Sequence, residues 1–334
     1  MAGEQAGEDE FALIARYFAP LARTPAARGL VDDVALLTQS GDLIVTADAI
    51  VESVHFLPSD PPDLIARKAL RTNVSDIVAK GAAPRFYLMA LIWPDARPAT
   101  QLEAFARGLE EDQRLYDLSL LGGDTTRTPG PLTIAITMFG APLGLTPTRS
   151  GARIGDDVWV SGTIGDADLG LMALRGGLDG ADAHARAWLA RRYQLPEPRI
   201  ELAPLIAAHA HASCDVSDGL MADTAKIAAA SGLGIEIEAA AVPLSAPARA
   251  WVGTDQARLI RLASGWRDGG DDYEILFAAP ASARDGLTTA ARGLGQQISR
   301  IGRVVPGAGA RLIGASGPID LGPGHAHRLG AGAR

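Results

Sequence analysis

The sequence predicts a protein of the α/β class with two domains, each containing a sheet and helices. The chain has 334 residues, and one domain usually has roughly 100–200 residues. Short apolar segments typical of strands alternate with longer segments of helical spacing, and a new series begins after a polar stretch at 147–152. We therefore expect a first domain over residues 1–146 and a second domain over residues 147–334.

The first domain is expected to contain a mixed sheet of about four strands with helices. Its strand patterns are short and rich in aliphatic residues, and the run at 86–93 is apolar throughout, as in a buried strand. The predicted strands are 34–37, 43–46, 86–93, 118–121 and 133–139. The predicted helices are 11–17, 64–78 and 102–116. Gly81 and Pro84 follow the second helix, as is usual after a helix C-terminus.

The second domain shows the same two kinds of pattern and is expected to be a further α/β unit. The predicted strands are 158–161, 235–238, 273–278, 301–305 and 311–313. The predicted helices are 168–174, 200–211 and 220–230.

The composition limits the classes of function. The net charge of -8 argues against broad binding to nucleic acids or anionic membranes, whose surfaces are also negative. The single cysteine, Cys214, excludes an intramolecular disulfide and fits a reducing compartment. No apolar run approaches the ~20 residues that span a bilayer, and residues 1–10 lack the features of a signal peptide. We expect a cytoplasmic protein that binds neither nucleic acid nor membrane.

Turns that carry aspartates are the most informative feature of the sequence. They are Val-Asp-Asp-Val at 31–34, Thr-Ala-Asp at 46–48, Asn-Val-Ser-Asp at 73–76, Gly-Gly-Asp at 122–124, Cys-Asp-Val-Ser-Asp-Gly at 214–219 and Gly-Gly-Asp-Asp-Tyr at 269–273. Each aspartate taken alone is more often a turn former or a helix cap, because its carboxylate accepts hydrogen bonds from nearby backbone N–H groups.

The turns taken together favour a metal and phosphate site. Carboxylates that converge in a partly desolvated cleft repel one another unless cations compensate their charge. Magnesium prefers oxygen ligands and is commonly held by carboxylates, waters and substrate phosphates. Glycines such as Gly122, Gly123, Gly269 and Gly270 allow a phosphate to approach the backbone. The pattern therefore predicts magnesium ions that bind the phosphates of a nucleotide.

Other common catalytic motifs are missing from the sequence. There is no G-x-x-x-x-G-K-[ST] loop, no G-x-G-x-x-G after a strand, no C-x-x-C, no H-E-x-x-H and no G-x-S-x-G. The three lysines, Lys68, Lys80 and Lys226, stand outside glycine-rich turns. Phosphate binding is thus expected to depend on acidic residues, metal, backbone N–H groups and arginine.

The ordered motifs resemble those of the thiamine-monophosphate kinase family, within the superfamily of aminoimidazole-ribonucleotide synthetase-like ATP enzymes. To the turns above they add Val-Glu-Ser-Val-His-Phe at 51–56 and Glu274 after the last turn. The resemblance extends from about Phe11 to His327, and the 51–56 and 215–219 motifs are closer to this kinase than to its purine-pathway relatives.

The resemblance implies the transfer of phosphate from ATP to thiamine monophosphate, giving thiamine diphosphate, with several Mg²⁺ ions and direct in-line transfer. It implies metal ligands at Asp33, Thr46, Asp48, Asp76, Asp124, Asp215 and Asp218. It implies ATP contacts at Gly123, Asp124, Arg149 and Ser217, and thiamine contacts at His55, Asp271 and His325. Asp76, Asp124 and Asp218 are the residues expected to be most directly catalytic.

The resemblance also implies a homodimer in which the two N-terminal sheets form a barrel, with ATP in the cleft between the domains. Three positions depart from the family pattern: Val31 replaces a glycine, Asp271 replaces a glutamate, and His325 replaces an aromatic residue. Two alternatives remain. One is a sister ATP-using synthetase that acts on another small substrate, and the other is a non-catalytic nucleotide-binding protein.

Overall fold

The computed structural model describes residues 10–31, 34–38, 40–264 and 270–319. The chain forms two compact units, and each is considered by itself. The first unit comprises the residues up to Ile77 together with Ala82–Pro142. The second comprises Val78–Gly81 together with the residues from Leu143 onward.

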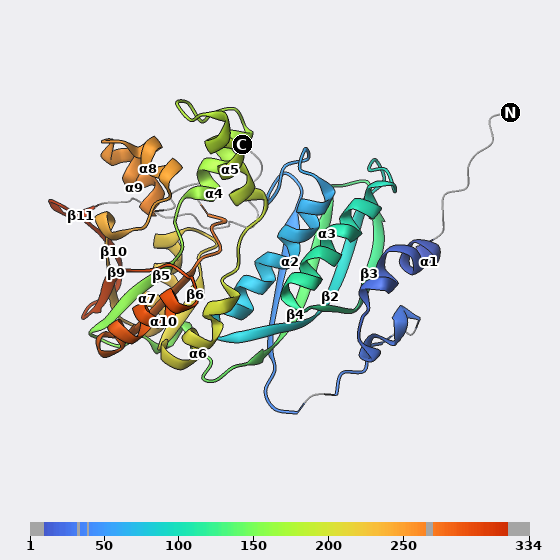
Figure 1. Cartoon of the computed structure of the whole chain (residues 1–334), viewed down its shortest axis with the longest axis horizontal. Coiled ribbons are helices and arrows are strands. Elements are labelled where there is room, and N and C mark those ends of the chain that lie inside the picture. The colour runs from blue at the N-terminus through green and yellow to red at the C-terminus, as the bar shows by residue number, and fades with distance from the viewer. Residues whose placement is uncertain (1–9, 32–33, 39, 265–269, 320–334) are drawn as a thin grey trace. The chain divides into compact units, whose positions relative to one another are not determined.

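The first unit is built on a four-stranded mixed sheet (Figure 1). Its strands are β1 (Ile44–Val51), β2 (Ala82–Pro94), β3 (Ser119–Thr128) and β4 (Thr133–Pro142). Their order across the sheet is β1-β4-β2-β3, with β2 and β3 parallel and the other two pairs antiparallel. Consequently β1 and β3 are the two edge strands. The motif at 46–48 lies on β1 and the motif at 122–124 lies on β3, so two motifs expected in one site are on opposite edges of the sheet.

Two helices, α2 (Pro62–Ala79) and α3 (Gln101–Tyr116), cover one face of this sheet (Figure 1). Alternate residues of β2 and β4 are buried beneath them, as the two-residue repeat of a strand requires. The packing is close: a Cβ added at Gly140 of β4 would lie 2.5 Å from the Ile77 side chain of α2. The helices are joined by Arg71 and Asp112, whose guanidinium Nε and carboxylate lie 2.6 Å apart in the interior.

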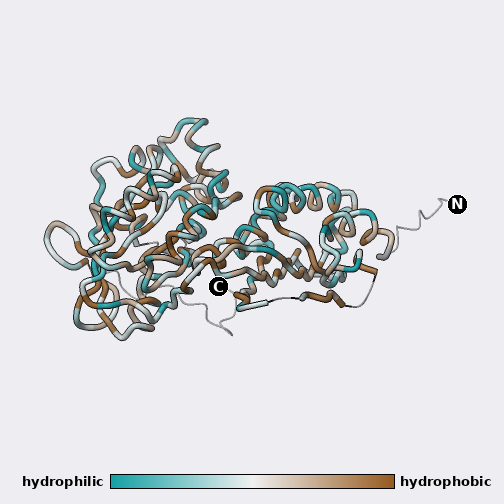
Figure 2. The backbone as a smooth tube through the Cα atoms, turned by 60° about the horizontal axis from the view of Figure 1, so that its bottom comes forward, coloured by the Kyte–Doolittle hydropathy of each residue, from teal (hydrophilic) through white to brown (hydrophobic). Residues whose placement is uncertain are grey.

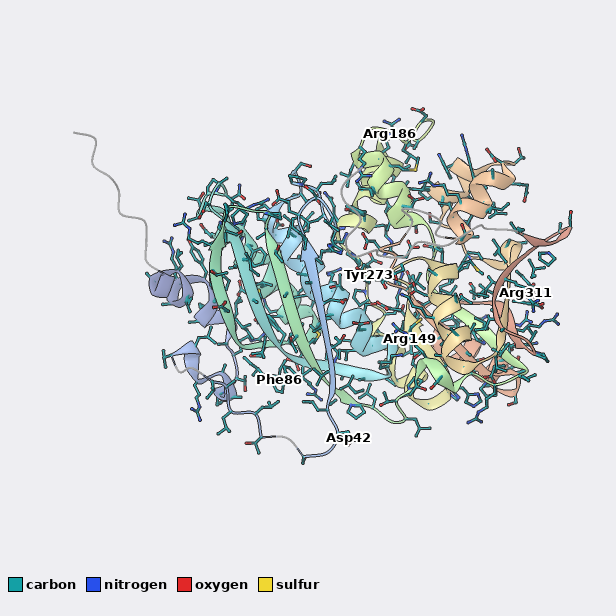
Figure 3. All side chains as sticks on the ribbon, turned by 180° about the vertical axis from the view of Figure 1, so that it is seen from behind. Asp42, Phe86, Arg149, Arg186, Tyr273 and Arg311 are labelled. Atoms are coloured by element: carbon teal, nitrogen blue, oxygen red, sulfur yellow. The ribbon has the colours of Figure 1, made fainter. Side chains whose placement is uncertain are left out.

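The opposite face of the sheet has no helix across it in the described part of the chain (Figure 3). Its side chains are mostly apolar, and several of them are alanines. Rows of paired residues across β1, β4 and β2 are Val45–Phe139–Phe86, Ala47–Thr137–Leu88 and Ala49–Ala135–Ala90. Val45 is 53% exposed. An apolar sheet face that remains open to solvent is a feature of surfaces that another molecule covers.

A segment with little regular structure precedes the sheet. It contains α1 (Glu10–Leu13), a π-helical turn at Ile14–Phe18, and two short 3₁₀ helices at Ala19–Leu21 and Pro25–Leu30. It is fixed to the sheet and to α3 because Arg23 N donates to Ser119 Oγ, at 3.0 Å, and Gln113 donates to the carbonyl oxygen of Leu21, also at 3.0 Å.

The second unit contains a seven-stranded mixed sheet of order β11-β10-β7-β9-β5-β8-β6. The strands are β5 (Asp156–Ser161), β6 (Ala212–Asp215), β7 (Gly234–Glu238), β8 (Ile275–Pro280), β9 (Ile298–Val305), β10 (Gly309–Gly314) and β11 (Gly317–Ile319). The central strands β5 and β8 are buried almost throughout, which explains the apolar runs at 158–160 and 275–279 within them.

Seven helices of the described chain belong to the second unit. They are α4 (Asp166–Leu174), α5 (Ala183–Gln194), α6 (Ala203–His209), α7 (Leu220–Ser231), α8 (Ala246–Val252), α9 (Gln256–Ser264) and α10 (Arg284–Gly293). A main core joins the sheet to α7, and a smaller core lies between α4, α5 and α8. Figure 2 shows the resulting mixture of hydrophobic and hydrophilic residues along these segments.

The α/β class, the two sheets and most predicted elements are confirmed. The predicted strand at 34–37 is wrong, because these residues adopt no regular structure and the first strand is β1. The predicted helix at 200–211 consists of a 3₁₀ turn, Ile200–Leu202, followed by α6, which ends at His209. Six further elements were not predicted from the sequence pattern: α5, β6, α8, α9, α10 and β11. Among the described helices, none combines the length and the apolar character needed to cross a membrane.

Candidate nucleotide and metal site

Thr46, Asp48 and Asp76 lie together at the β1 edge of the first unit. Thr46 and Asp48 are two residues apart on β1 and therefore face the same side, toward α2. The hydroxyl of Thr46 donates to Asp76 Oδ2 at 2.6 Å, and the backbone N–H of Asp48 donates to Asn73 Oδ1 at 3.1 Å. Asn73 and Asp76 are one turn apart on α2, so this helix presents both side chains to β1.

The chemistry of this edge fits Mg²⁺. The donors are a hydroxyl and carboxylates, which are the oxygen ligands that this ion prefers. Ligand oxygens about 2.0–2.1 Å from an octahedral ion lie roughly 2.9 Å from one another. The 2.6 Å separation between Thr46 Oγ1 and Asp76 Oδ2 therefore needs only a small adjustment to become one edge of such an octahedron.

Gly123 and Asp124 lie on the other edge strand, β3, beside a cavity of about 190 Å³. One side of the cavity is formed by Gly122–Thr125, and the other side is apolar, with Ile14, Phe18 and Leu30 from the N-terminal segment. A pocket with apolar walls and a few polar groups at one end suits a heterocycle with phosphates attached. The cavity therefore fits part of a nucleotide.

Gly123 is required by its position. Its φ is +154°, and an added Cβ would lie 1.8 Å from the carbonyl oxygen of Met89 on β2. The neighbouring Gly122 is different, because the nearest atom to an added Cβ there is a Leu88 methyl carbon 3.7 Å away.

The two groups of acidic residues in the first unit are separated across the sheet. Asp48 pairs with Ile136, Ile136 with Met89, and Met89 with Gly123, which precedes Asp124. This row crosses three strand spacings, or about 14 Å at 4.7–4.9 Å each. One copy of the sheet therefore does not bring Asp48 and Asp124 to the same metal ion.

His55 lies in a tight loop just after β1. Its Nδ1 accepts a hydrogen bond from the backbone N–H of Val51 at 3.0 Å, so in the neutral ring the proton is on Nε2. The ammonium of the buried Lys68 donates to the His55 carbonyl oxygen at 2.7 Å. The loop also contains Ser53 with a positive φ of 67°. The sequence motif thus encodes a fixed position for the imidazole.

Asp215, Ser217 and Asp218 form the turn between β6 and α7 in the second unit. Asp215 ends the strand and is 5% exposed. The backbone N–H groups of Ser217 and Asp218 both donate to Asp223 Oδ2, each at 3.0 Å. Asp223 lies in the first turn of α7, so a buried carboxylate of the helix shapes the turn that precedes it.

Lys226, for which the sequence motifs imply no role, contacts the same turn. Its Nζ lies 2.6 Å from Asp218 Oδ2 and 2.7 Å from Asp223 Oδ1. Burial alone would lower the pKa of Lys226, but its interactions with Asp223 and Asp218 raise it above the ordinary value. Asp223 and Lys226 are three residues apart on a predicted helix, and this spacing was the sequence signal for their contact.

Asp271 lies in a strained loop that is tied to the same turn. Asp271 and Tyr273 both have positive φ, 65° and 51°. Their backbone N–H groups donate to the carbonyl oxygens of Ser217 and Val216, at 2.9 and 2.8 Å. The second unit thus brings the predicted thiamine-contacting residue and the predicted ATP-contacting residue onto two adjoining segments.

Arg149 begins a 3₁₀ turn, Arg149–Gly151, that lies beside β6 (Figure 3). Its side chain is exposed, and its carbonyl oxygen accepts from Ser231 Oγ at 3.0 Å. The nearby Cys214 is fully buried, and this burial raises the pKa of its thiol well above the ordinary value. Cys214 is therefore a packing residue.

Two predicted site residues, Asp33 and His325, lie outside the described residues. Within the described ranges, no group of three or more His, Cys, Asp or Glu side chains is arranged to hold a metal ion. This agrees with the separation of the acidic residues across the first sheet. The metal ligands that the sequence predicts stay predictions.

Comparisons with known proteins agree with these features. Residues 31–141 match the family AIR synthase related protein, N-terminal domain, and residues 153–314 match AIR synthase related protein, C-terminal domain. The chain is 46% identical over 307 residues to a thiamine-monophosphate kinase of Caulobacter vibrioides, covering 90% of this chain and 85% of that protein.

Solved structures give the same result. The crystal structure of a thiamine-monophosphate kinase from Stenotrophomonas maltophilia K279a is 38% identical, with a TM-score of 0.80, and covers 91% of this chain and 96% of that one. A structure of AaThiL complexed with AMPPCP and TMP is 30% identical, with a TM-score of 0.73, covering 91% and 93%. By its sequence over nearly its whole length and by its fold, the chain belongs to the thiamine-monophosphate kinase family.

Proposed function

We propose that the protein transfers the terminal phosphate of ATP to thiamine monophosphate and forms thiamine diphosphate. The observation that carries this proposal is the similarity to thiamine-monophosphate kinases over 90% of the chain. It is supported by a related structure, AaThiL, that holds AMPPCP and TMP. The cavity beside Gly123 and the oxygen ligands at the β1 edge are suitable for a nucleotide and its metal.

The chemistry requires little from a protein base. The acceptor is a phosphate, which is already an anionic nucleophile, so the main barrier is the approach of two negatively charged groups. Bound Mg²⁺ would neutralise part of this charge. The protein's part is to hold the two substrates in line and to place cations and N–H donors around the transferring group. Asp271 and His55 would orient thiamine monophosphate, and Ser217 and Arg149 would contact ATP.

The residues proposed to hold Mg²⁺ all have side-chain oxygen atoms, which this ion prefers as ligands. They are Asp33, Thr46, Asp48, Asp76, Asp124 and Asp215. Asp218 differs from these residues because the ammonium of Lys226 already contacts its carboxylate.

A homodimer would shorten the separation of about 14 Å between the strand positions of Asp48 and Asp124 in one sheet. We propose that β1 of one protomer pairs with β3 of its partner, and that the second β3–β1 pair closes an eight-stranded barrel by two-fold symmetry. Strand β1, which carries Asp48, would then lie beside the partner's β3. Asp48 faces α2, and Asp124, in register with Ala90, is on the face that would line the barrel interior. The apolar face with Ala49, Ala135 and Ala90 would fill the barrel interior.

A coupled assay for ADP, with Mg²⁺, ATP and thiamine monophosphate, tests the function. We expect turnover with thiamine monophosphate and not with unphosphorylated thiamine, and a new diphosphate ester detectable by ³¹P NMR. Folded protein that produces no thiamine diphosphate would disprove the proposal. Release of ADP only with a different small acceptor would instead support a sister synthetase, and binding of AMPPCP without any turnover would support a non-catalytic protein.

A further inference from the structure

The ammonium group of Lys226 occupies a position between two carboxylates at the β6–α7 turn. Asp218 Oδ2 is 2.6 Å from the Lys226 nitrogen, and Asp223 Oδ1 is 2.7 Å from it. These distances are those of short charge-assisted hydrogen bonds. A cation is therefore already present at the carboxylate of Asp218, the residue for which the family resemblance implies a metal ion.

The Lys226 side chain is 36% exposed, and the position of its ammonium is set by the buried carboxylate of Asp223. Asp223 is 1% exposed. Its other oxygen, Oδ2, accepts the backbone N–H groups of Ser217 and Asp218. Burial raises the pKa of the Asp223 carboxyl above its ordinary value, and the charge of Lys226 opposes that rise. Asp223 thus holds the ammonium on one side and the turn on the other, so Lys226 is positioned by the fold.

A divalent ion on the same oxygen of Asp218 would lie within a few ångströms of the ammonium. Two cations at that separation repel each other strongly, even at the effective dielectric constant of a protein surface. Displacing Lys226 would also leave Asp223 buried without its charge partner, which is costly. Both effects disfavour a metal ion at this carboxylate.

We propose that Lys226 serves as a fixed cation that replaces a metal ion at Asp218, so that Asp218 is not a metal ligand in this protein. The inference rests on the proposed function, because it concerns how many cations the kinase binds. The ammonium compensates the charge of Asp218 at every Mg²⁺ concentration, whereas the first unit depends on bound metal.

Counting bound Mn²⁺ tests the inference without any measurement of turnover. Full-length protein saturated with AMPPCP is titrated with Mn²⁺, and free Mn²⁺ is followed by electron paramagnetic resonance. We expect Asp218→Asn to bind as many ions as the wild type. Lys226→Met is expected to bind one ion more, because the two carboxylates lose their cation. Lys226→Arg keeps the positive charge and should bind as many Mn²⁺ ions as the wild type.

The double variant Lys226→Met with Asp218→Asn supplies the matched control, and its count is expected to return to the wild-type value. The inference is overturned by the loss of one ion in Asp218→Asn, or by an unchanged count in folded Lys226→Met. If Lys226→Met does not fold, the number of Mn²⁺ ions bound by Asp218→Asn decides by itself whether Asp218 is a metal ligand. Asp76→Asn separates this result from the proposed function, because an unchanged count there would contradict the magnesium site at the β1 edge.

Discussion

Asp272 and Glu274 are two residues apart and both buried, yet their surroundings shift the pKa values of the two carboxyl groups in opposite directions. Asp272 accepts backbone N–H groups of Gly165 and Ala167 at the start of α4, and burial raises its pKa to about 8. Burial alone would raise the pKa of Glu274 as well, but hydrogen bonds and charge from Arg199, with Arg192 nearby, lower it. These two carboxylates hold the loop that carries Asp271.

The raised pKa of Asp272 predicts a stability that falls as the pH rises. The unfolded carboxyl ionises near pH 4 and the folded one near pH 8. Between these values the folded state binds more protons, so the free energy of unfolding decreases by on the order of 1 kcal/mol per pH unit. Urea unfolding of the wild type and Asp272→Asn at pH 5, 6, 7 and 8 measures this. If the free energy of unfolding changes with pH by the same amount in both proteins, the pKa of Asp272 is not raised in the folded state.

Asp76 gives a direct test of the metal site. Asp76→Asn keeps an oxygen that can accept the Thr46 hydroxyl, so the hydrogen bond at 2.6 Å has a substitute and the fold should persist. The loss of charge should lower kcat about 100-fold or more, with a higher Mg²⁺ requirement. Steady-state kinetics against Mg²⁺ concentration, with circular dichroism as the control for folding, measure both effects. Near-normal kcat would mean that Asp76 binds no metal.

At the scale of elements, the close contact between β2 and β3 places the predicted ATP-binding residues. The parallel register sets Gly123 opposite Met89, with a shift in register between Tyr87 and Leu88. This irregularity and the positive φ of Gly123 shape the middle of β3 beside the cavity. Of the two adjacent glycines, only Gly123 is required by its surroundings, and Gly122 is not.

Gly123→Ala and Gly122→Ala form a matched pair. At Gly123 a Cβ would lie 1.8 Å from the Met89 carbonyl oxygen, so β3 must move away from β2. The substitution should cost roughly 1–3 kcal/mol of stability and weaken ATP binding. At Gly122 the nearest contact is 3.7 Å, and little change is expected. Thermal unfolding compares the stability of the two variants, and calorimetric titration with AMPPCP compares their affinity for the nucleotide. Equal effects would show that the close approach is not important.

At the scale of the whole molecule, the open apolar face of the first sheet has consequences for assembly. Ala135 stands in the middle of that face, between Ala49 and Ala90. A charged side chain there could not be buried in a barrel without a partner. Ala135→Arg should therefore give a monomer of 34.7 kDa, whereas the wild type should have twice that mass in sedimentation experiments.

The control for assembly is Glu110→Arg, a similar change of charge on the exposed surface of α3. This variant should remain dimeric and active. A wild type that is monomeric at micromolar concentration, or an active Ala135→Arg monomer, would contradict the proposed barrel. Loss of activity together with loss of the dimer would indicate that residues of both protomers complete the site.

The sequence determined the fold class, the family, most strands and helices, and the order of the aspartate turns. Those features depend on local periodicity and on short motifs, which a single chain displays directly. The strand predicted at 34–37 is wrong because a short apolar run indicates a strand only where it is buried and paired, whereas Val34 and Leu36 are 61% and 60% exposed.

Only the tertiary structure decided which of these residues meet. Asp48 and Asp124 fall on opposite edges because β4 and β2 lie between their strands, and strand order is a long-range property. Lys226 reaches Asp218 because the β6–α7 turn folds back over the first turns of α7. The sequence therefore determines which acidic residues the turns carry. Strand order and helix packing set the distances between these residues, and the distances decide how their charges are compensated.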